Sequence, residues 1–284
     1  MNAENRTAAP AAAIRYAALT IVFIAATVVL PCSASAQGIT PQLDSSQSKL
    51  ELIRKINDPI SNVLSLPVET NILFVPEPQQ TVDYIWNVRP AIPISFGSEW
   101  RIISHLDVPV VYRQQPSGAH SVGLSDTELT LFFTSKEPHP NFRWGFGPLW
   151  RLPTATNKDL GPRRWGTGPA AVVVRETDQW TFGVLGHQVW SFAGVGTTGV
   201  NATFINPWMS YAWKSGLSLR AETESTYDWT TSQWTAPVEA GFSKLLPMGK
   251  QAINVGGNIL YFVERGSNDA RWGMRFTANF VLRK

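Results

Sequence analysis

Apolar and polar residues alternate with a period of two along most of this chain. In the segment LSLRAETESTYDWT, Leu217, Leu219 and Tyr227 share one register, while Arg220 and Glu224 share the other. Such alternation predicts β-strands whose two faces meet different environments. The pattern recurs in twelve stretches, at 63–75, 81–96, 100–112, 124–135, 142–152, 165–175, 179–192, 200–213, 217–229, 234–245, 251–264 and 271–283.

The predicted strands are longer than those of a soluble protein. Most of the twelve stretches hold 11–16 residues, whereas strands in globular proteins typically have about 5–6. A tilted strand needs about 9–11 residues to cross a bilayer. The lengths therefore favour strands that span a membrane.

The connections between the stretches alternate in length. Short turns fall at 97–99, 136–141, 176–178, 214–216 and 246–250, and mostly longer loops fall at 75–80, 113–123, 153–164, 193–199, 230–233 and 265–270. Outer-membrane barrels have short periplasmic turns, longer external loops and aromatic girdles at both interfaces, and many aromatic residues here lie near strand ends. The pattern predicts an all-β fold, an antiparallel transmembrane β-barrel of about 12 strands.

The N-terminal part has the features of an export signal. Arg6 and Arg15 precede an uncharged run at 16–30, and Ala34-Ser35-Ala36 fits a signal-peptidase site. We expect residues 1–36 to be a signal peptide that is removed. An alternative is a lipoprotein acylated at Cys32, although Pro31 argues against it.

The residues that follow predict a short helix ahead of the barrel. Leu50, Ile53 and Ile56 have helical spacing, and Pro59 should end the helix. Residues 37–62 are therefore expected to form a periplasmic segment with a short helix, and 63–284 to form the barrel. A plug inside the barrel is the alternative role for this segment.

Composition agrees with a barrel and excludes several functions. Of 284 residues, 16% are charged, against about 25% in soluble domains. The formal net charge is +3 without a block of like charge, so nucleic acid is not an expected partner. The single cysteine falls within the expected signal, which leaves no thiol for a disulfide or a metal. We expect no cofactor and no metal.

The charged register should face the lumen, because an Arg or Lys on the lipid face at mid-depth costs about 2–4 kcal/mol. A charged constriction that selects solutes is one reading. A salt-bridged, filled interior is the other. The lumen candidates are Asp83, Arg89, Arg101, His105, Asp107, Glu128, Arg143, Arg151, Arg220, Glu222, Glu224, Glu239, Glu264 and Arg275.

The long loop at 153–164 is a second candidate site. It ends in Arg163 and Arg164. The loop could fold inward and gate the lumen, its arginines could bind lipid phosphates, or it could be an ordinary solvated loop.

Several segments also resemble a known family. They are NDPISNVLSLPVETN (57–71), GFGPLWRLPTATNKDLGPRRWGTGPAAVVV (145–174), WTFGVLGHQVWSFAG (180–194), STYDWTTSQWTAPVEAGFSKLLPMGKQ (225–251) and WGMRF (272–276). These segments resemble the outer-membrane β-barrels associated with the meta-pathway of phenol degradation. The resemblance implies an outer-membrane barrel and suggests transport of small solutes such as aromatic compounds. In one respect the chain departs from the common pattern: outer-membrane barrels commonly end on an aromatic residue, whereas here Phe280 is followed by VLRK.

Sequence signals for catalysis are weak. GVGTTG (194–199) matches a nucleotide-binding pattern, but it follows a strand without opening a helix. The sequence therefore predicts a non-enzymatic channel or transporter of the bacterial outer membrane, for small solutes such as aromatic or hydrophobic compounds. Expected partners are outer-membrane lipid and lipopolysaccharide, the barrel assembly machinery and an unidentified small solute. The alternatives are a non-conducting structural or adhesive barrel, and a membrane-embedded hydrolase that would need His187 to face lipid.

Overall fold

The computed structural model describes residues 46–137, 141–248 and 251–282. The expected signal peptide and residues 37–45 lie outside this range. No helix in the described part is long and apolar enough to cross a membrane.

One helix and fifteen strand segments make up the described fold. The helix is α2 (Ser46–Ile56). The strand segments are β1 (Leu64–Val75), β2 (Thr81–Val88), β3 (Ala91–Phe96), β4 (Trp100–Gln114), β5 (His120–Leu124), β6 (Thr127–Ser135), β7 (Phe142–Leu152), β8 (Arg164–Thr177), β9 (Trp180–Gly194), β10 (Asn201–Ala212), β11 (Leu217–Glu222), β12 (Ser225–Asp228), β13 (Gln233–Met248), β14 (Gln251–Glu264) and β15 (Trp272–Leu282).

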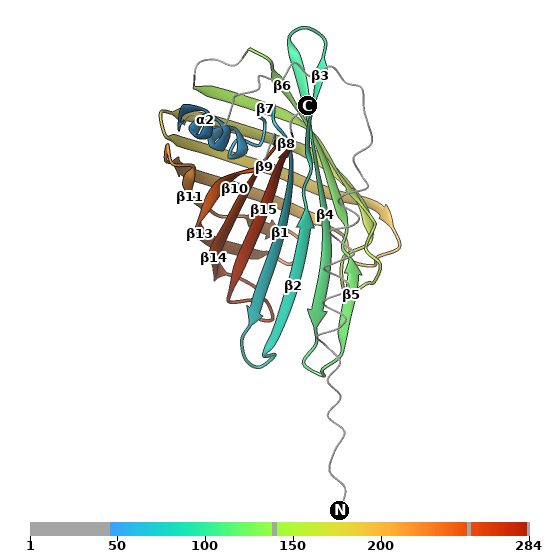
Figure 1. Cartoon of the computed structure of the whole chain (residues 1–284). Helices are drawn as coiled ribbons and strands as arrows, with labels where there is room; N and C mark the ends of the chain where they lie inside the picture. The colour runs from blue at the N-terminus through green and yellow to red at the C-terminus, as the bar shows by residue number, and fades with distance from the viewer. Residues whose placement is uncertain (1–45, 138–140, 249–250, 283–284) are drawn as a thin grey trace, which may run out of the picture. The chain divides into compact units, whose positions relative to one another are not determined.

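The strand segments form a closed antiparallel barrel of twelve strands (Figure 1). Three strands are interrupted, so that β2 continues into β3, β5 into β6 and β11 into β12. The first interruption holds Pro90, which has no N–H for a ladder hydrogen bond. Pairing of β1 with β15, from Leu64 opposite Leu282 onward, closes the sheet. The predicted barrel of about 12 strands is confirmed.

The outer face of the barrel is apolar. Phe146, Phe242, Ile259 and Phe276 are each more than half exposed, and Ile259 reaches 68%. Exposed apolar surface on this scale marks a face that meets lipid or a partner. Pairing of β1 with β15 also closes the sheet among the described strands, so that no open side of the sheet faces hydrocarbon, which would not tolerate one. The outer belt is therefore the lipid-facing surface of a transmembrane barrel.

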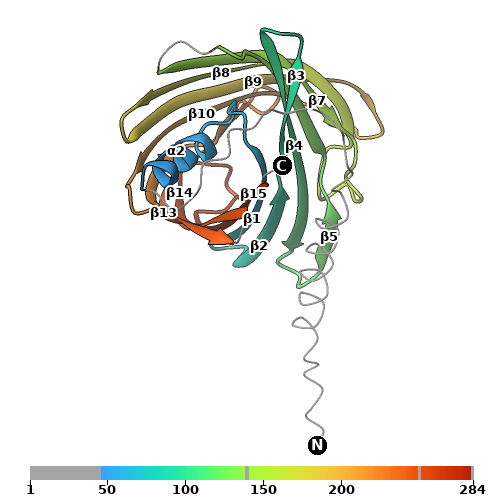
Figure 2. The same ribbon diagram turned by 45° about the horizontal axis from the view of Figure 1, so that its top comes forward.

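The two rims of the barrel differ. We call the rim with the tight β3–β4, β8–β9 and β10–β11 connections the turn rim, and the opposite end the loop rim. Helix α2 lies at the turn rim, within the ring of strands (Figure 2). Its Leu50, Leu52 and Ile53 pack against Ala212 and Leu245, among other barrel side chains. The helix predicted from spacing is confirmed, and it ends at Ile56, before Pro59.

The lipid-facing assignment leads to a stability prediction. Changing Ile259→Arg, in the middle of β14, should lower the free energy of unfolding from lipid vesicles by about 2–4 kcal/mol, because it places a charge against hydrocarbon. Urea titration measures the change. Val195→Arg, in the loop after β9, should cost at most about 1 kcal/mol. Equal effects of the two changes would contradict the assignment.

Candidate functional site

The barrel encloses a cavity of about 490 Å³. Its wall comes from inward residues of most strands and from the segment that follows α2, which includes Asn57, Asp58 and Pro59. Small-molecule sites in proteins typically measure about 300–1,000 Å³. The cavity is thus large enough for a small solute, and it has two chemically different halves.

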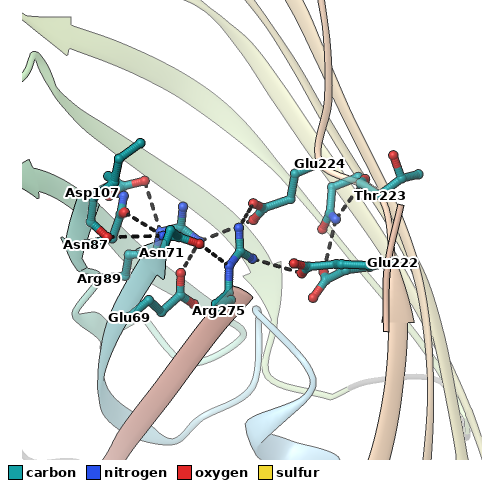
Figure 3. A network of polar contacts seen from close by, with 12 residues as sticks. Glu69, Asn71, Asn87, Arg89, Asp107, Glu222, Thr223, Glu224 and Arg275 are labelled. Atoms are coloured by element: carbon teal, nitrogen blue, oxygen red, sulfur yellow. Dashed lines mark hydrogen bonds and ion pairs between the residues drawn. The ribbon is translucent and has the colours of Figure 1, made fainter. Parts of the chain in front are cut away.

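The charged half is organised around Arg89, which follows β2 (Figure 3). Its guanidinium lies 3.0 Å from Asp107, 2.9 Å from Glu69 and 3.2 Å from Glu224. Asn87 donates to the other oxygen of Asp107 at 2.8 Å. Charge-assisted contacts of this kind are the strongest hydrogen bonds available to side chains.

Arg275 on β15 is the second centre of the same network. It donates to Glu224 at 2.6 Å, to Glu239 at 2.9 Å and to Asn71 at 2.7 Å. Arg275 is 7% exposed and Glu239 is 1% exposed. Burial of these charges is tolerated because each has an oppositely charged partner.

Glu224 joins the two arginines across the lumen. It lies in the interruption between β11 and β12, whereas Arg275 and Arg89 come from β15 and from the end of β2. In the sheet, β13 and β14 separate β12 from β15, and β1 separates β15 from β2. The contacts of Glu224 therefore bridge opposite parts of the barrel wall (Figure 3).

A third arginine extends the charged half toward β10. Arg220 makes two contacts with Glu222, at 2.6 and 2.8 Å. Asn206 donates to the same carboxylate at 3.1 Å. Arg220 also lies 5.4 Å from the centroid of the Trp208 ring, a distance typical of a cation–π contact.

The other half of the lumen is largely apolar. Phe132, Leu149, Val189 and Trp208 form a buried cluster with Ile60 of the N-terminal segment. These barrel residues come from β6, β7, β9 and β10, which together with β8, between β7 and β9, form one continuous part of the sheet.

Two polar groups lie within this apolar half. Arg151 pairs with Glu128 at 2.5 Å. His187 lines the cavity, with its ring stacked on Phe204 at 4.8 Å. His187 therefore faces the lumen rather than lipid, which removes the orientation that the hydrolase alternative needs.

The segment after α2 is fixed inside the barrel by polar contacts. Asp58 lies 2.5 Å from Arg143, and His105 Nε2 donates to the Pro59 carbonyl at 2.6 Å. Arg54 of α2 pairs with Glu176 at 2.8 Å, and Arg143 pairs with the same carboxylate. The segment thus partly occupies the lumen at the turn rim.

Asp58 lies outside the strands and is 2% exposed. Burial raises the pKa of its carboxyl from 3.8 to about 6, and the nearby Arg143 and the Ile60 N–H only partly oppose this. The charged form of Asp58 is therefore less favoured at this position than it is in water.

The loop at 153–163 folds over the inner face of β5. Asp126 accepts hydrogen bonds from the backbone N–H groups of Ala155 and Arg163, at 3.0 and 2.9 Å. A Cβ at Gly123 would lie 2.0 Å from Thr156 Oγ1, so only glycine allows this approach. Arg164 donates to the Gly196 carbonyl at 2.6 Å. The loop packs against β5, but none of its residues lines the cavity. The three roles considered for it stay predictions.

The structure places the predicted lumen residues in two groups. Nine of them line the cavity: Arg89, His105, Asp107, Glu128, Arg151, Arg220, Glu222, Glu224 and Arg275.

The other five have different surroundings. Glu239 is buried against Arg275, and Arg143 holds the N-terminal segment. Asp83 pairs with Arg113 at 3.2 Å. Arg101 is half-buried on β4, and Glu264 is exposed at the end of β14.

Several residues of the site were not predicted from the sequence, and two of them, Glu69 and Asp58, are carboxylates that line the cavity. Glu69 shares the inward register of β1 with Asn71, so the period-two pattern contained the signal. Asp58 lies outside any strand, and no periodic pattern points to it.

Comparison with solved structures finds the same fold in outer-membrane proteins. An outer membrane channel from Pseudomonas putida F1 matches with a TM-score of 0.60 and 14% identity, over 77% of this chain and 93% of that one. The NanC porin matches with a TM-score of 0.50 and 11% identity, over 77% of this chain and 100% of that one. Outer membrane phospholipase A from Escherichia coli matches with a TM-score of 0.45 and 12% identity, over 78% of this chain and 96% of that one. No family model and no curated protein matches the chain. The chain therefore has the fold of outer-membrane β-barrels.

The bridging position of Glu224 predicts its contribution to stability. Glu224→Gln should lower the free energy of unfolding by about 1–3 kcal/mol, since two guanidiniums lose a charged partner. Urea unfolding in vesicles measures this. The matched change Glu264→Gln, at the exposed end of β14, should stay within about 0.5 kcal/mol of the unsubstituted protein. A neutral effect of Glu224→Gln would mean that the cross-lumen contacts do not stabilise the barrel.

The raised pKa of Asp58 predicts a pH dependence of the N-terminal segment. Its folded pKa of about 6 exceeds the ordinary 3.8, so the folded state binds the proton more tightly. The resulting stabilisation, about 3 kcal/mol, is complete below pH 4 and is lost as the pH rises through 6. Native-state hydrogen exchange of residues 57–61, corrected for intrinsic rates, should show this loss. Asp58→Asn should remove it, and an unchanged profile in that variant would assign the effect to another group.

Proposed function

We propose that this protein is a channel of the bacterial outer membrane that passes small solutes, aromatic or hydrophobic compounds among them. The cavity inside the barrel is the observation that carries the proposal. Small eight-stranded barrels fill their interior with side chains. This twelve-stranded barrel retains about 490 Å³ lined by charged and apolar groups together, which suits transient occupation by a solute.

The two halves of the lumen support different aspects of transport. The network around Arg89 and Arg275 narrows the lumen with charges of both signs, as selective constrictions do. The half-buried apolar side chains Leu185 and Phe204 offer a surface that an aromatic or hydrophobic compound can contact. A general water-filled pore would not need that surface.

The rest of the proposal concerns the setting of the barrel. The apolar belt would contact outer-membrane lipid, with lipopolysaccharide in the outer leaflet, and the barrel assembly machinery would insert it. Export would rely on a cleavable signal within residues 1–36. The turn rim, with α2, would then face the periplasm.

Single-channel recording in planar bilayers tests the proposal. The purified protein should give small, reproducible current steps. Arg143→Ala removes the partner of Asp58 and Glu176, so it should release the N-terminal segment and raise the conductance at least twofold. Glu264→Gln, at an exposed strand end, should leave the steps unchanged.

The absence of current is informative only for folded protein. Heat-modifiable migration on gels shows that each variant has folded and inserted. If folded protein and the folded Arg143→Ala variant both fail to conduct, the channel proposal is wrong.

A further inference from the structure

We propose that the cavity is a binding site for small primary amines with an apolar body. This inference rests on the proposed function, since it names the class of solute that the channel would hold. Three features of the cavity carry it: an excess of carboxylates, two acceptors without donors, and an apolar wall facing the charged half.

The first feature is the balance of charge in the network around the lumen. Within the described chain it contains five carboxylates and three guanidiniums. The carboxylates are Glu69, Asp107, Glu222, Glu224 and Glu239, and the guanidiniums are Arg89, Arg220 and Arg275. Glu239 is buried against Arg275 and does not line the cavity. Among the described residues, six carboxylates and five basic side chains line the cavity itself, and this formal excess of one negative charge favours a cation over an anion.

The arginines are also fully engaged. Arg89 contacts three carboxylates, Arg275 contacts two, and Arg220 holds Glu222 through two nitrogens. An anionic solute would have to break these contacts to reach a guanidinium. A cationic solute gains carboxylate contacts and leaves the existing pairs in place.

The second feature is a pair of unoccupied acceptors. Asn254 and Asn279 lie opposite each other on β14 and β15, line the cavity and are 7% and 6% exposed. Neither Oδ1 accepts a hydrogen bond from any described residue. Asn254 Nδ2 donates to Ser243 Oγ at 3.0 Å.

A primary ammonium matches these groups. It carries three donors and no acceptor, so it can serve acceptors and carboxylates at the same time. Thr277 and Glu69, which face each other on β15 and β1, also line the cavity, between the amides and the charged network. The polar wall is therefore continuous and rich in acceptors.

The third feature selects the rest of the solute. Leu185 and Phe204, on β9 and β10, line the cavity and are only half-buried. Burial of an apolar body against them yields about 25 cal/mol for each Å² removed from water. Trp208 is 5% exposed, and its Nε1–H donates to no described acceptor. This N–H could donate to a hydroxyl group on the apolar part of the solute.

Three probes of one shape test the proposal. Phenethylamine, 2-phenylethanol and phenylacetate share a body and differ in the charge of the head. Calorimetry on the purified protein should show phenethylamine binding at least tenfold more tightly than either of the others. Phenylacetate binding as tightly as the amine, or more tightly, would overturn the proposal.

Variants connect the preference with the cavity. Asn254→Ala with Asn279→Ala removes both acceptors without changing any charge, and should weaken phenethylamine binding at least fivefold while leaving 2-phenylethanol unaffected. Glu69→Gln should also weaken the binding of phenethylamine. Glu264→Gln is the matched control and should bind as the unsubstituted protein does. Unchanged amine binding in the folded double variant would overturn the assignment to this wall.

Current recordings separate this inference from the channel proposal. In a conducting protein, phenethylamine should interrupt the current in a concentration-dependent way, and phenylacetate should not. Conduction without a preference for the amine would overturn the inference and keep the channel. If the folded protein binds the amine but neither it nor its folded Arg143→Ala variant conducts, the result would support the site and overturn the channel.

Discussion

The high cost of charge in hydrocarbon is the constraint on which this structure depends. It keeps charged side chains off the lipid face at mid-depth, so that the charged registers of the strands turn toward the lumen. The register of Leu217 and Leu219 meets the bilayer for this reason, and that of Arg220 and Glu222 lines the cavity. Closure of the sheet between β1 and β15 follows from the same physics, because an open edge would expose unpaired peptide groups to lipid.

Charges turned inward create a second requirement, because the lumen is only partly wet. The network meets it by sharing partners. Glu224 serves both Arg89 and Arg275, and Arg89 serves three carboxylates in turn. The interruption between β11 and β12 contributes to this, since Glu224 sits where regular pairing stops. The break in the strand is therefore part of what lets its carboxylate reach across the lumen.

Sequence periodicity accounts for most of the fold, and for only part of the site. Strand length and alternation identify the twelve strands and the inward side of residues such as Arg275, because each strand is a local pattern. The pattern does not, however, predict which charged residues pair with each other across the lumen. Arg89 and Glu224 are 135 residues apart, and no local pattern encodes which strands face each other across a barrel.

Other parts of the site depend on packing rather than on pattern. Asp58 is drawn into the lumen because the neighbouring Ile60 packs among Phe132, Leu149 and Val189. That packing is visible only once the barrel is closed. The packing of the loop at 153–163 against β5 likewise depends on the lack of a side chain at Gly123, which sequence alone does not distinguish from an ordinary turn glycine.

A lumen built from shared ion pairs is well suited to admit a small cation. Net stability from a partly exposed pair is modest, because attraction and desolvation nearly cancel. Arg89, Asp107 and Glu224 retain side-chain exposures of 29%, 34% and 21%, so water reaches them. A cation entering beside Glu224 or Asp107 adds a partner without stripping the arginines of theirs. The network of ion pairs can therefore accept a cationic solute more readily than an anionic one.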